Sequence, residues 1–225
     1  MFAGWRFRRA VANLEQAGLP ILQRYAGSTW PDRKDPVSQV DFLALDFELD
    51  GLGASAHILQ AGWVHFTAAA IPLADAQSRD IRSTQIRDDV AVTIHGIGEQ
   101  RAREGAPLEA VLEELLPTIA GRVIVAHGAS IEAGVIKRAT RAVLGQAVPV
   151  RTICTLALER KLRPQLPGAE PYRLHRCRAR YNLPPYAMHD ALEDALAAAE
   201  LFLAQLSCMP ADTSTGELED LAIHH

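Results

Sequence analysis

Residues 42–52 of the chain read Phe-Leu-Ala-Leu-Asp-Phe-Glu-Leu-Asp-Gly-Leu. The apolar start predicts a buried strand, and Asp46 and Glu48, two positions apart, then lie on one face of it where it leaves the sheet. Two like charges held side by side repel each other. A hard divalent cation between them removes this repulsion, because carboxylate oxygens are the natural ligands of magnesium and manganese. This stretch therefore predicts a metal site at the end of a core strand.

The composition indicates one globular domain with a sizeable core. The chain has 225 residues, of which 48% are hydrophobic and 22% are charged, as in ordinary globular proteins. The formal net charge of -4 excludes a protein that coats nucleic acid through a global positive field, but permits a small local footprint on a nucleic acid end.

The cysteines and the hydropathy pattern bear on location. Cys154, Cys177 and Cys208 are an odd number without metal-ligand spacing, which indicates reduced thiols in a cytoplasmic protein. No apolar run approaches a membrane-spanning length. We therefore expect a cytoplasmic protein with no membrane partner.

Hydrophobic spacing predicts strands first and then alternating helices and strands. After the first core strand, residues 57–67 and 68–73 predict an antiparallel hairpin or meander. Apolar periodicity and turn residues then predict helices over 108–119, 131–144, 155–162 and 190–206, and strands over 122–126 and 148–153. This order implies an α/β fold in which helices flank a mixed sheet.

The sequence predicts that the chain divides into three segments. Residues 1–39 form a helical extension and a Pro/Gly-containing linker, residues 40–207 form the main domain, and residues 208–225 form a flexible tail. The tail is assigned as flexible because it is polar and acidic.

Three side chains downstream complete the predicted site. Glu132 lies in the first turn of a helix that directly follows a strand, where functional side chains of open α/β sheets collect. His189 stands at the flexible entry to the last long helix, and Asp194 follows about one turn into it. A rigid acid and a mobile imidazole then face the same pocket.

These residues fall in motifs that resemble those of the DEDDh 3'-5' exonucleases, the superfamily of the proofreading epsilon subunit of bacterial DNA polymerase III. The resemblance covers residues 40–207 in the family's order. The motifs are Asp46-Phe47-Glu48-Leu49-Asp50-Gly51-Leu52, Ile94-His95-Gly96-Ile97, His127-Gly128-Ala129-Ser130-Ile131-Glu132 and His189-Asp190-Ala191-Leu192-Glu193-Asp194-Ala195. The resemblance implies a ribonuclease H-like fold with a mixed five-stranded sheet flanked by helices.

The resemblance also implies two divalent cations, magnesium or manganese, about 3.5–4 Å apart, which activate water and stabilise the leaving 3' oxygen. Asp46 would bridge the ions. Glu48 and Asp194 would hold the ion that activates water, and Glu132 would support the second ion. His189 would deprotonate the water, which suits an imidazole with an ordinary pKa of about 6.5. The product would be a nucleoside 5'-monophosphate.

Three residues in two of the motifs depart from the family pattern. Leu49-Asp50 replaces the usual Thr-Thr, which removes hydroxyls near the terminal nucleotide, so we expect substrate affinity or choice to differ. Glu132 replaces the usual Asp and is longer by one methylene, so we expect altered geometry at the second metal rather than loss of activity. A partner of the helix dipole with no metal role is the alternative for Glu132.

Substrate contacts are expected from residues beside the motif acids and from the basic stretch 173–180. Apolar side chains there can stack on the terminal base, with core packing as the alternative. A guanidinium can contact a phosphate, with a solvated surface as the alternative. The predicted substrate-binding residues are Phe47, Leu49, Leu52, Ile131 and Arg178. His95 and His127 are expected to be structural.

The function expected from the resemblance is removal of nucleotides from single-stranded or frayed 3' ends of DNA. An RNA-trimming or oligoribonucleotide-degrading enzyme shares the motifs, and no residue identifies a contact to a 2'-hydroxyl. A non-catalytic nucleic-acid-binding or regulatory module is a second alternative. The segment from Gln205 to Met209 resembles a sliding-clamp peptide, although the last turn of a helix is the simpler interpretation. Homodimer formation is left open.

Overall fold

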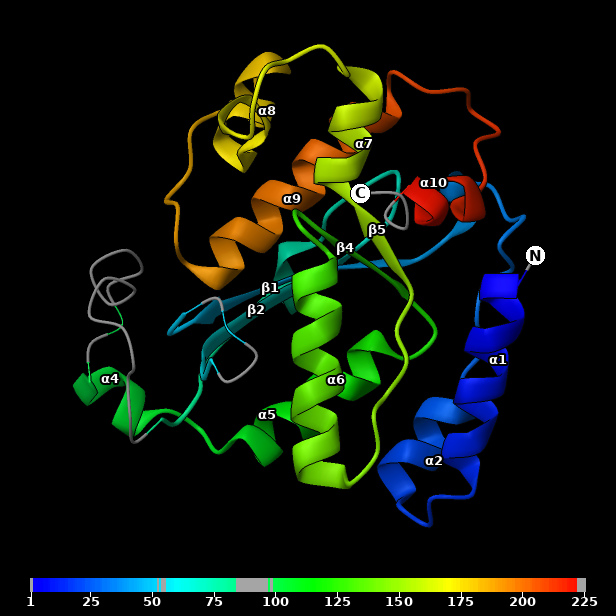
Figure 1. Cartoon of the computed structure of the whole chain (residues 1–225), viewed down its shortest axis with the longest axis vertical. Coiled ribbons are helices and arrows are strands. Elements are labelled where there is room, and N and C mark those ends of the chain that lie inside the picture. Colours follow the sequence, from blue (N-terminus) through cyan, green and yellow to red (C-terminus); the bar gives the residue numbers. More distant parts are fainter. Residues whose placement is uncertain (1, 52, 54–55, 84–96, 98, 222–225) are drawn as a thin grey trace.

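A five-stranded mixed sheet forms the centre of the protein (Figure 1). The computed structural model describes residues 2–51, 53, 56–83, 97 and 99–221. The strands are β1 (Phe42–Leu49), β2 (Ile58–Phe66), β3 (Gln77–Asp80), β4 (Val123–Ala126) and β5 (Thr152–Cys154). Their order is β3-β2-β1-β4-β5, with β1 antiparallel to β2 and parallel to β4. The predicted fold class is confirmed.

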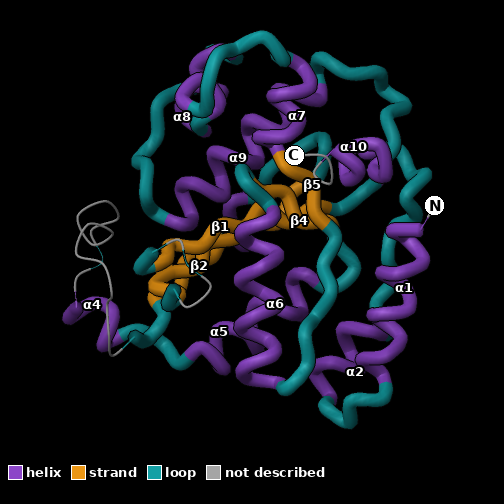
Figure 2. The backbone as a smooth tube through the Cα atoms, in the orientation of Figure 1, coloured by secondary structure: helices purple, strands orange, loops and turns teal. Residues whose placement is uncertain are grey.

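Helices cover both faces of this sheet (Figure 2). The longer helices are α1 (Phe2–Glu15), α5 (Leu108–Ile119), α6 (Ser130–Leu144), α7 (Thr155–Leu162) and α9 (Ala191–Leu206). The shorter ones are α2 (Pro20–Ala26), α4 (Glu99–Glu104), α8 (Leu174–Arg180) and α10 (Thr215–Leu221), with 3-10 turns at Val37–Gln39, Leu73–Asp75 and Glu170–Tyr172.

Alternation along β1 separates two cores, because successive side chains of a strand point to opposite faces. Leu43 and Leu45 belong to the core that α1, α2, α5 and α6 cover. Phe42 and Ala44 belong to the core on the other face, which α7, α9 and α10 cover. The first core strand is thus buried on both sides, as its apolar sequence predicts.

The first turn of α9 lies directly on β2. A β-carbon at Gly62 would come within 2.1 Å of the Leu192 backbone nitrogen, so only glycine leaves room for the helix. The buried Gln60 accepts a hydrogen bond from the Ala191 N–H (2.8 Å) and donates to Asp190 (3.3 Å). Asp190 in turn caps the helix by accepting from the N–H groups of Leu192 and Glu193. These contacts fix the start of α9 against the sheet.

Three expectations about the elements are wrong. The third strand is β3, not residues 68–73, because the chain turns directly after β2, where the Thr67 N–H donates to the Ala70 carbonyl at 3.0 Å. The last strand is shorter than predicted and begins at Thr152. The tail is not flexible throughout: α10 buries Leu218 in the α9 core, and Glu219 accepts a hydrogen bond from Arg151 Nε at 2.7 Å.

The N-terminal extension shares the main core. Leu22 and Tyr25 of α2 are buried in the same cluster as residues of α5 and α6, and the Tyr25 hydroxyl donates to the Pro149 carbonyl at 2.6 Å. In the described part of the chain, none of the helices combines the length and apolar character needed to cross a membrane.

Candidate active site

The two acids of β1 lie beyond the point where β4 stops pairing with it. β4 pairs with residues 42–44, whereas Asp46 and Glu48 face Gly62 and Gln60 of β2. Both carboxylates are half-buried. They therefore lie at an open end of the sheet, on the strand edge that β4 has left free.

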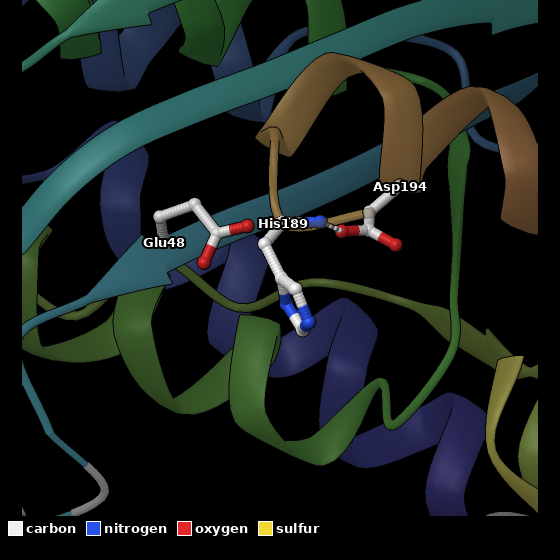
Figure 3. Close-up of side chains that lie close together, drawn as sticks. All are labelled: Glu48, His189 and Asp194. Atoms are coloured by element: carbon white, nitrogen blue, oxygen red, sulfur yellow. Dashed lines mark hydrogen bonds between the residues drawn. The ribbon is translucent and has the colours of Figure 1, made fainter. Parts of the chain in front are cut away.

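The loop before α9 brings an imidazole to this place, and α9 itself brings a third acid. Ligand atoms of Glu48, His189 and Asp194 all lie within 4.8 Å of one another (Figure 3). His189 has a left-handed backbone with φ of 68°, and its N–H donates to Asp194 Oδ2 at 2.8 Å. This hydrogen bond offsets part of the cost of the left-handed turn, so the two residues hold each other in place.

Glu132 lies in the first turn of α6, and α6 covers the face of the sheet opposite to the one that α9 covers. The chain leaves β4 through Gly128, whose φ of 111° favours glycine. Glu132 is only 4% exposed, and its Oε2 finds no hydrogen-bond partner among the residues that the structure describes. An unpaired buried carboxylate oxygen is costly unless a cation compensates it.

The pKa values show that the acids share one electrostatic environment. Burial raises the pKa of Asp46 well above its ordinary value, and the carboxylates of Glu132, Asp194 and Glu48 raise it further. Burial raises the pKa of Glu132 to about 8. Burial, with help from Asp194 and Asp190, raises the pKa of Glu48 to about 7. Carboxylates whose pKa values are raised by burial and by neighbouring carboxylates are typical of functional sites.

A divalent cation fits this donor set. Carboxylate oxygens are the preferred ligands of magnesium and manganese, and a positive ion would relieve both the repulsion at Asp46 and the unpaired oxygen of Glu132. Asp46 and Glu132 are outside the group of ligand atoms that lie within 4.8 Å of one another. Glu132, Asp194 and Glu48 are nevertheless close enough to Asp46 for their charges to raise its pKa.

Comparison with known proteins agrees with this geometry. A family model described as "Exonuclease" (RNase T) matches residues 43–202. The chain belongs to this exonuclease family. The resemblance to the DEDDh exonucleases is thereby confirmed, and that family generally uses divalent metal ions.

Curated relatives include two PolC-type DNA polymerases III. The exonuclease is 28% identical over 188 residues to the protein of Thermotoga petrophila, with 80% of this chain and 13% of the relative covered. It is 27% identical over 172 residues to the protein of Caldanaerobacter subterraneus, with 74% and 12% covered. The chain thus spans about an eighth of the length of these relatives.

Solved structures share the fold. E. coli Exonuclease I, in complex with an oligonucleotide, has a TM-score of 0.63 at 18% identity, with 77% of this chain and 42% of that chain covered. Exonuclease X, in complex with 5' overhanging duplex DNA, has 0.58 at 23% identity, with 80% and 99% covered. The nuclease domain of 3'hExo, bound to rAMP, has 0.60 at 14% identity, with 75% and 92% covered.

The expected substrate-binding residues divide between surface and core. Ile131 is 48% exposed at the start of α6 and is free to meet a ligand. Phe47 is buried in the α5 and α6 core, and Leu49 packs against that core. The interpretation of Phe47 as a base-stacking residue is therefore wrong, because its ring is already covered. Leu52 and His95 lie outside the described residues.

Arg178 is a second correction. It is only 2% exposed, and it donates to the carbonyls of Ala197 (2.9 Å) and Pro184 (3.0 Å). Its Nη2 also pairs with Glu200 at 2.7 Å. The guanidinium is thus used inside the protein, so the expected phosphate contact is wrong.

Tyr186 is a site residue that the sequence did not indicate. It lies in the loop before α9, and its hydroxyl donates to Asp194 Oδ1 at 2.7 Å. Burial, followed by the hydrogen bond to Asp194, raises the pKa of Tyr186, so the phenol stays protonated and is the donor. A tyrosine in a Pro-rich loop has no periodicity that marks it; its spacing of three residues before His189 is the one available signal.

Other predicted positions are structural. His127 is held between Thr155 Oγ1 (2.9 Å) and the Tyr172 carbonyl (2.8 Å), and burial lowers its pKa to about 4. Asp50, in place of the family's second Thr, closes the turn after β1 by accepting from the His57 N–H at 2.6 Å.

Gln205, the first residue of the segment that resembles a sliding-clamp peptide, is not accessible to a partner. Gln205 is buried, and its amide donates to the Thr155 carbonyl at 3.0 Å and to Glu159 at 2.9 Å. A clamp could not contact this amide without opening the α7 and α9 packing. The segment is the end of α9 and the turn that follows it, which is close to the simpler interpretation.

Proposed function

We propose that this protein is a metal-dependent 3'-5' exonuclease that removes nucleotides from single-stranded or frayed 3' ends of DNA and releases nucleoside 5'-monophosphates. The observation that carries the proposal is the meeting of ligand atoms of Glu48, His189 and Asp194 within 4.8 Å of one another. These residues lie beyond the point where β4 stops pairing with β1. A cytoplasmic location is part of this proposal.

The candidate site residues have different roles in the proposed reaction. Asp46, Glu48, Asp194 and Glu132 would hold two magnesium or manganese ions, which when bound activate the attacking water and stabilise the leaving 3' oxygen. His189 has an exposed side chain beside these acids, so its ring can take a proton from water and release it to solvent. Ile131, exposed one residue before Glu132, offers an apolar surface to the terminal base.

DNA is favoured as substrate by the relatives. The curated relatives are DNA polymerases, and the Exonuclease X structure contains DNA. RNA is the second candidate, because the 3'hExo nuclease domain, which shares the fold, binds rAMP. A regulatory module without activity is the alternative that a cleavage assay removes.

The test is cleavage of matched DNA and RNA oligonucleotides in magnesium or manganese. A 5'-labelled strand should shorten stepwise, and a 3'-labelled strand should release labelled mononucleotide from the start. Asp194→Asn should abolish shortening, whereas Glu193→Gln, at the exposed neighbouring acid, should leave it intact. Failure of the wild-type protein to shorten any strand in either metal would refute the proposal.

A further inference from the structure

Both oxygens of Asp194 are engaged by donors from the loop before α9. The Tyr186 hydroxyl donates to Oδ1 at 2.7 Å, and the His189 N–H donates to Oδ2 at 2.8 Å. Two donors on two oxygens fix the rotation of the carboxylate. Each oxygen keeps a further lone pair, and the group lies beside Glu48 and His189.

Arg178 packs against the ring of Tyr186. Its Cζ lies 4.9 Å from the centroid of the Tyr186 ring, within the range of a cation–π contact. The same guanidinium donates to the carbonyl of Pro184, two residues before Tyr186, and to that of Ala197, three residues after Asp194. It therefore ties the loop that carries Tyr186 to the helix that carries Asp194.

Tyr186 is also the anchor of the segment that presents His189. Pro184, Pro185, Ala187, Met188 and His189 are all exposed, whereas Tyr186 is half-buried. The segment thus has few other contacts that hold it against α9. The Tyr186 hydroxyl is thus the one side-chain donor to Asp194 among the described residues of this segment, and it acts together with the His189 N–H.

We propose that Tyr186 is a positioning residue, held by Arg178, that sets the Asp194 carboxylate in the orientation that receives a divalent cation. The inference deepens the proposed function and rests on it for the role of the cation. Hydrogen-bond partners of metal-binding carboxylates typically change metal affinity or activity by about 10- to 100-fold when they are removed. Tyr186 acts through Asp194 and is not assigned a contact with substrate.

The test compares two tyrosines that both donate to carboxylates. Tyr186→Phe removes the hydroxyl and keeps the ring under Arg178. Tyr181→Phe is the matched control, because the Tyr181 hydroxyl donates to Glu159 Oε2 at 2.9 Å in the packing between α7 and α8. Manganese is titrated calorimetrically into the metal-free full chain of each variant, so the readout does not depend on nuclease activity.

We expect the manganese affinity of Tyr186→Phe to fall by about 10- to 100-fold and that of Tyr181→Phe to stay within about twofold of the wild type. In the cleavage assay, excess manganese should restore the rate of Tyr186→Phe while KM for the oligonucleotide stays unchanged. Unchanged affinity in Tyr186→Phe, or an equal loss in both variants, would overturn the positioning role.

The outcomes also separate this role from the proposed function. A wild-type protein that binds manganese but cleaves nothing, with weaker binding in Tyr186→Phe, refutes the exonuclease and upholds the positioning role. Should Tyr186→Phe fold poorly, Tyr186→His keeps a ring and a donor, and partial recovery of manganese affinity relative to Tyr186→Leu is expected. No difference between those two variants would count against the role.

Discussion

The Glu132 carboxylate on α6 is, after burial, the largest cause of the raised pKa of Asp46 on β1. The two residues come from distant parts of the chain, and, among the residues that the structure describes, the charged groups that shift the pKa of Asp46 are all carboxylates. Such a pair opposes folding whenever both groups are ionised, because two unpaired charges cannot share a poorly solvated site at low cost. The site is therefore built at the expense of stability in the absence of metal.

Replacing Glu132 by Gln should stabilise the metal-free protein at high pH. The folded-state pKa of Glu132 is raised from 4.5 to about 8, so its contribution to stability is full below pH 4.5 and is lost as the pH rises through 8. Glu132→Gln should therefore gain about 1–3 kcal/mol of unfolding free energy at pH 8.5 and much less at pH 5. Urea unfolding in a chelator measures this difference.

The control for that variant is Glu109→Gln, at an exposed first-turn acid of α5. It should change stability by less than about 0.5 kcal/mol at either pH. A Glu132→Gln protein that is no more stable than the wild type at pH 8.5 would contradict the assigned electrostatics.

Metal binding should release protons near neutral pH. Ligating carboxylates must be ionised, yet the pKa of Glu48 is raised to about 7 and that of Glu132 to about 8 in the metal-free protein. Manganese should thus bind more tightly at pH 8 than at pH 6 and should raise the unfolding temperature more at the higher pH. Calorimetry in two buffers of different ionisation enthalpy counts the protons, and equal heats in both buffers would argue against the prediction.

The sequence predicted the strand and its acids because their signals are local. A run of apolar residues that ends in Asp46 and Glu48 predicts a buried strand with two acids at its end, and the structure has this strand. Tyr186 was missed because its role depends on a loop that returns to α9. No periodicity in residues 181–190 encodes that return.

Tyr186 has a role that was missed, whereas Arg178 was given a role in phosphate binding that it does not have. Several arginines close together in sequence resemble a solvated basic surface, yet Arg178 pairs with Glu200 and Arg180 pairs with the buried Glu159 at 2.9 Å. Their partners lie in α9 and α7, so only the packing of α8 against both helices reveals them. The same holds for Gln205, whose partners lie in α7.

Gly62→Ala should disturb the site by displacing the start of α9. The added β-carbon would lie 2.1 Å from the Leu192 nitrogen and 2.2 Å from the Ala191 carbonyl carbon, so the helix must shift away from β2. We expect a loss of at least about 1–3 kcal/mol of unfolding free energy, with weaker metal binding because Asp194 moves with the helix.

Gly134→Ala is the matched glycine change, since the nearest atom to its β-carbon is the flexible end of Arg138 at 3.6 Å. In α6 it should be neutral or stabilising by about 0.5–1 kcal/mol. Chemical unfolding and manganese titration of both variants measure these effects. A Gly62→Ala protein with wild-type stability would show that α9 does not press on β2 as described.

Arg178→Ala should destabilise the protein rather than weaken nucleic acid binding directly. The change leaves the carbonyls of Ala197 and Pro184 without their donor and removes the cation from the Tyr186 ring. Loss of such buried interactions should cost about 2–4 kcal/mol of unfolding free energy. Arg176→Ala, at a side chain that is 61% exposed, should cost less than about 0.5 kcal/mol. If instead Arg178→Ala kept its stability and lost the salt dependence of oligonucleotide binding, a phosphate contact would replace the structural role assigned to it.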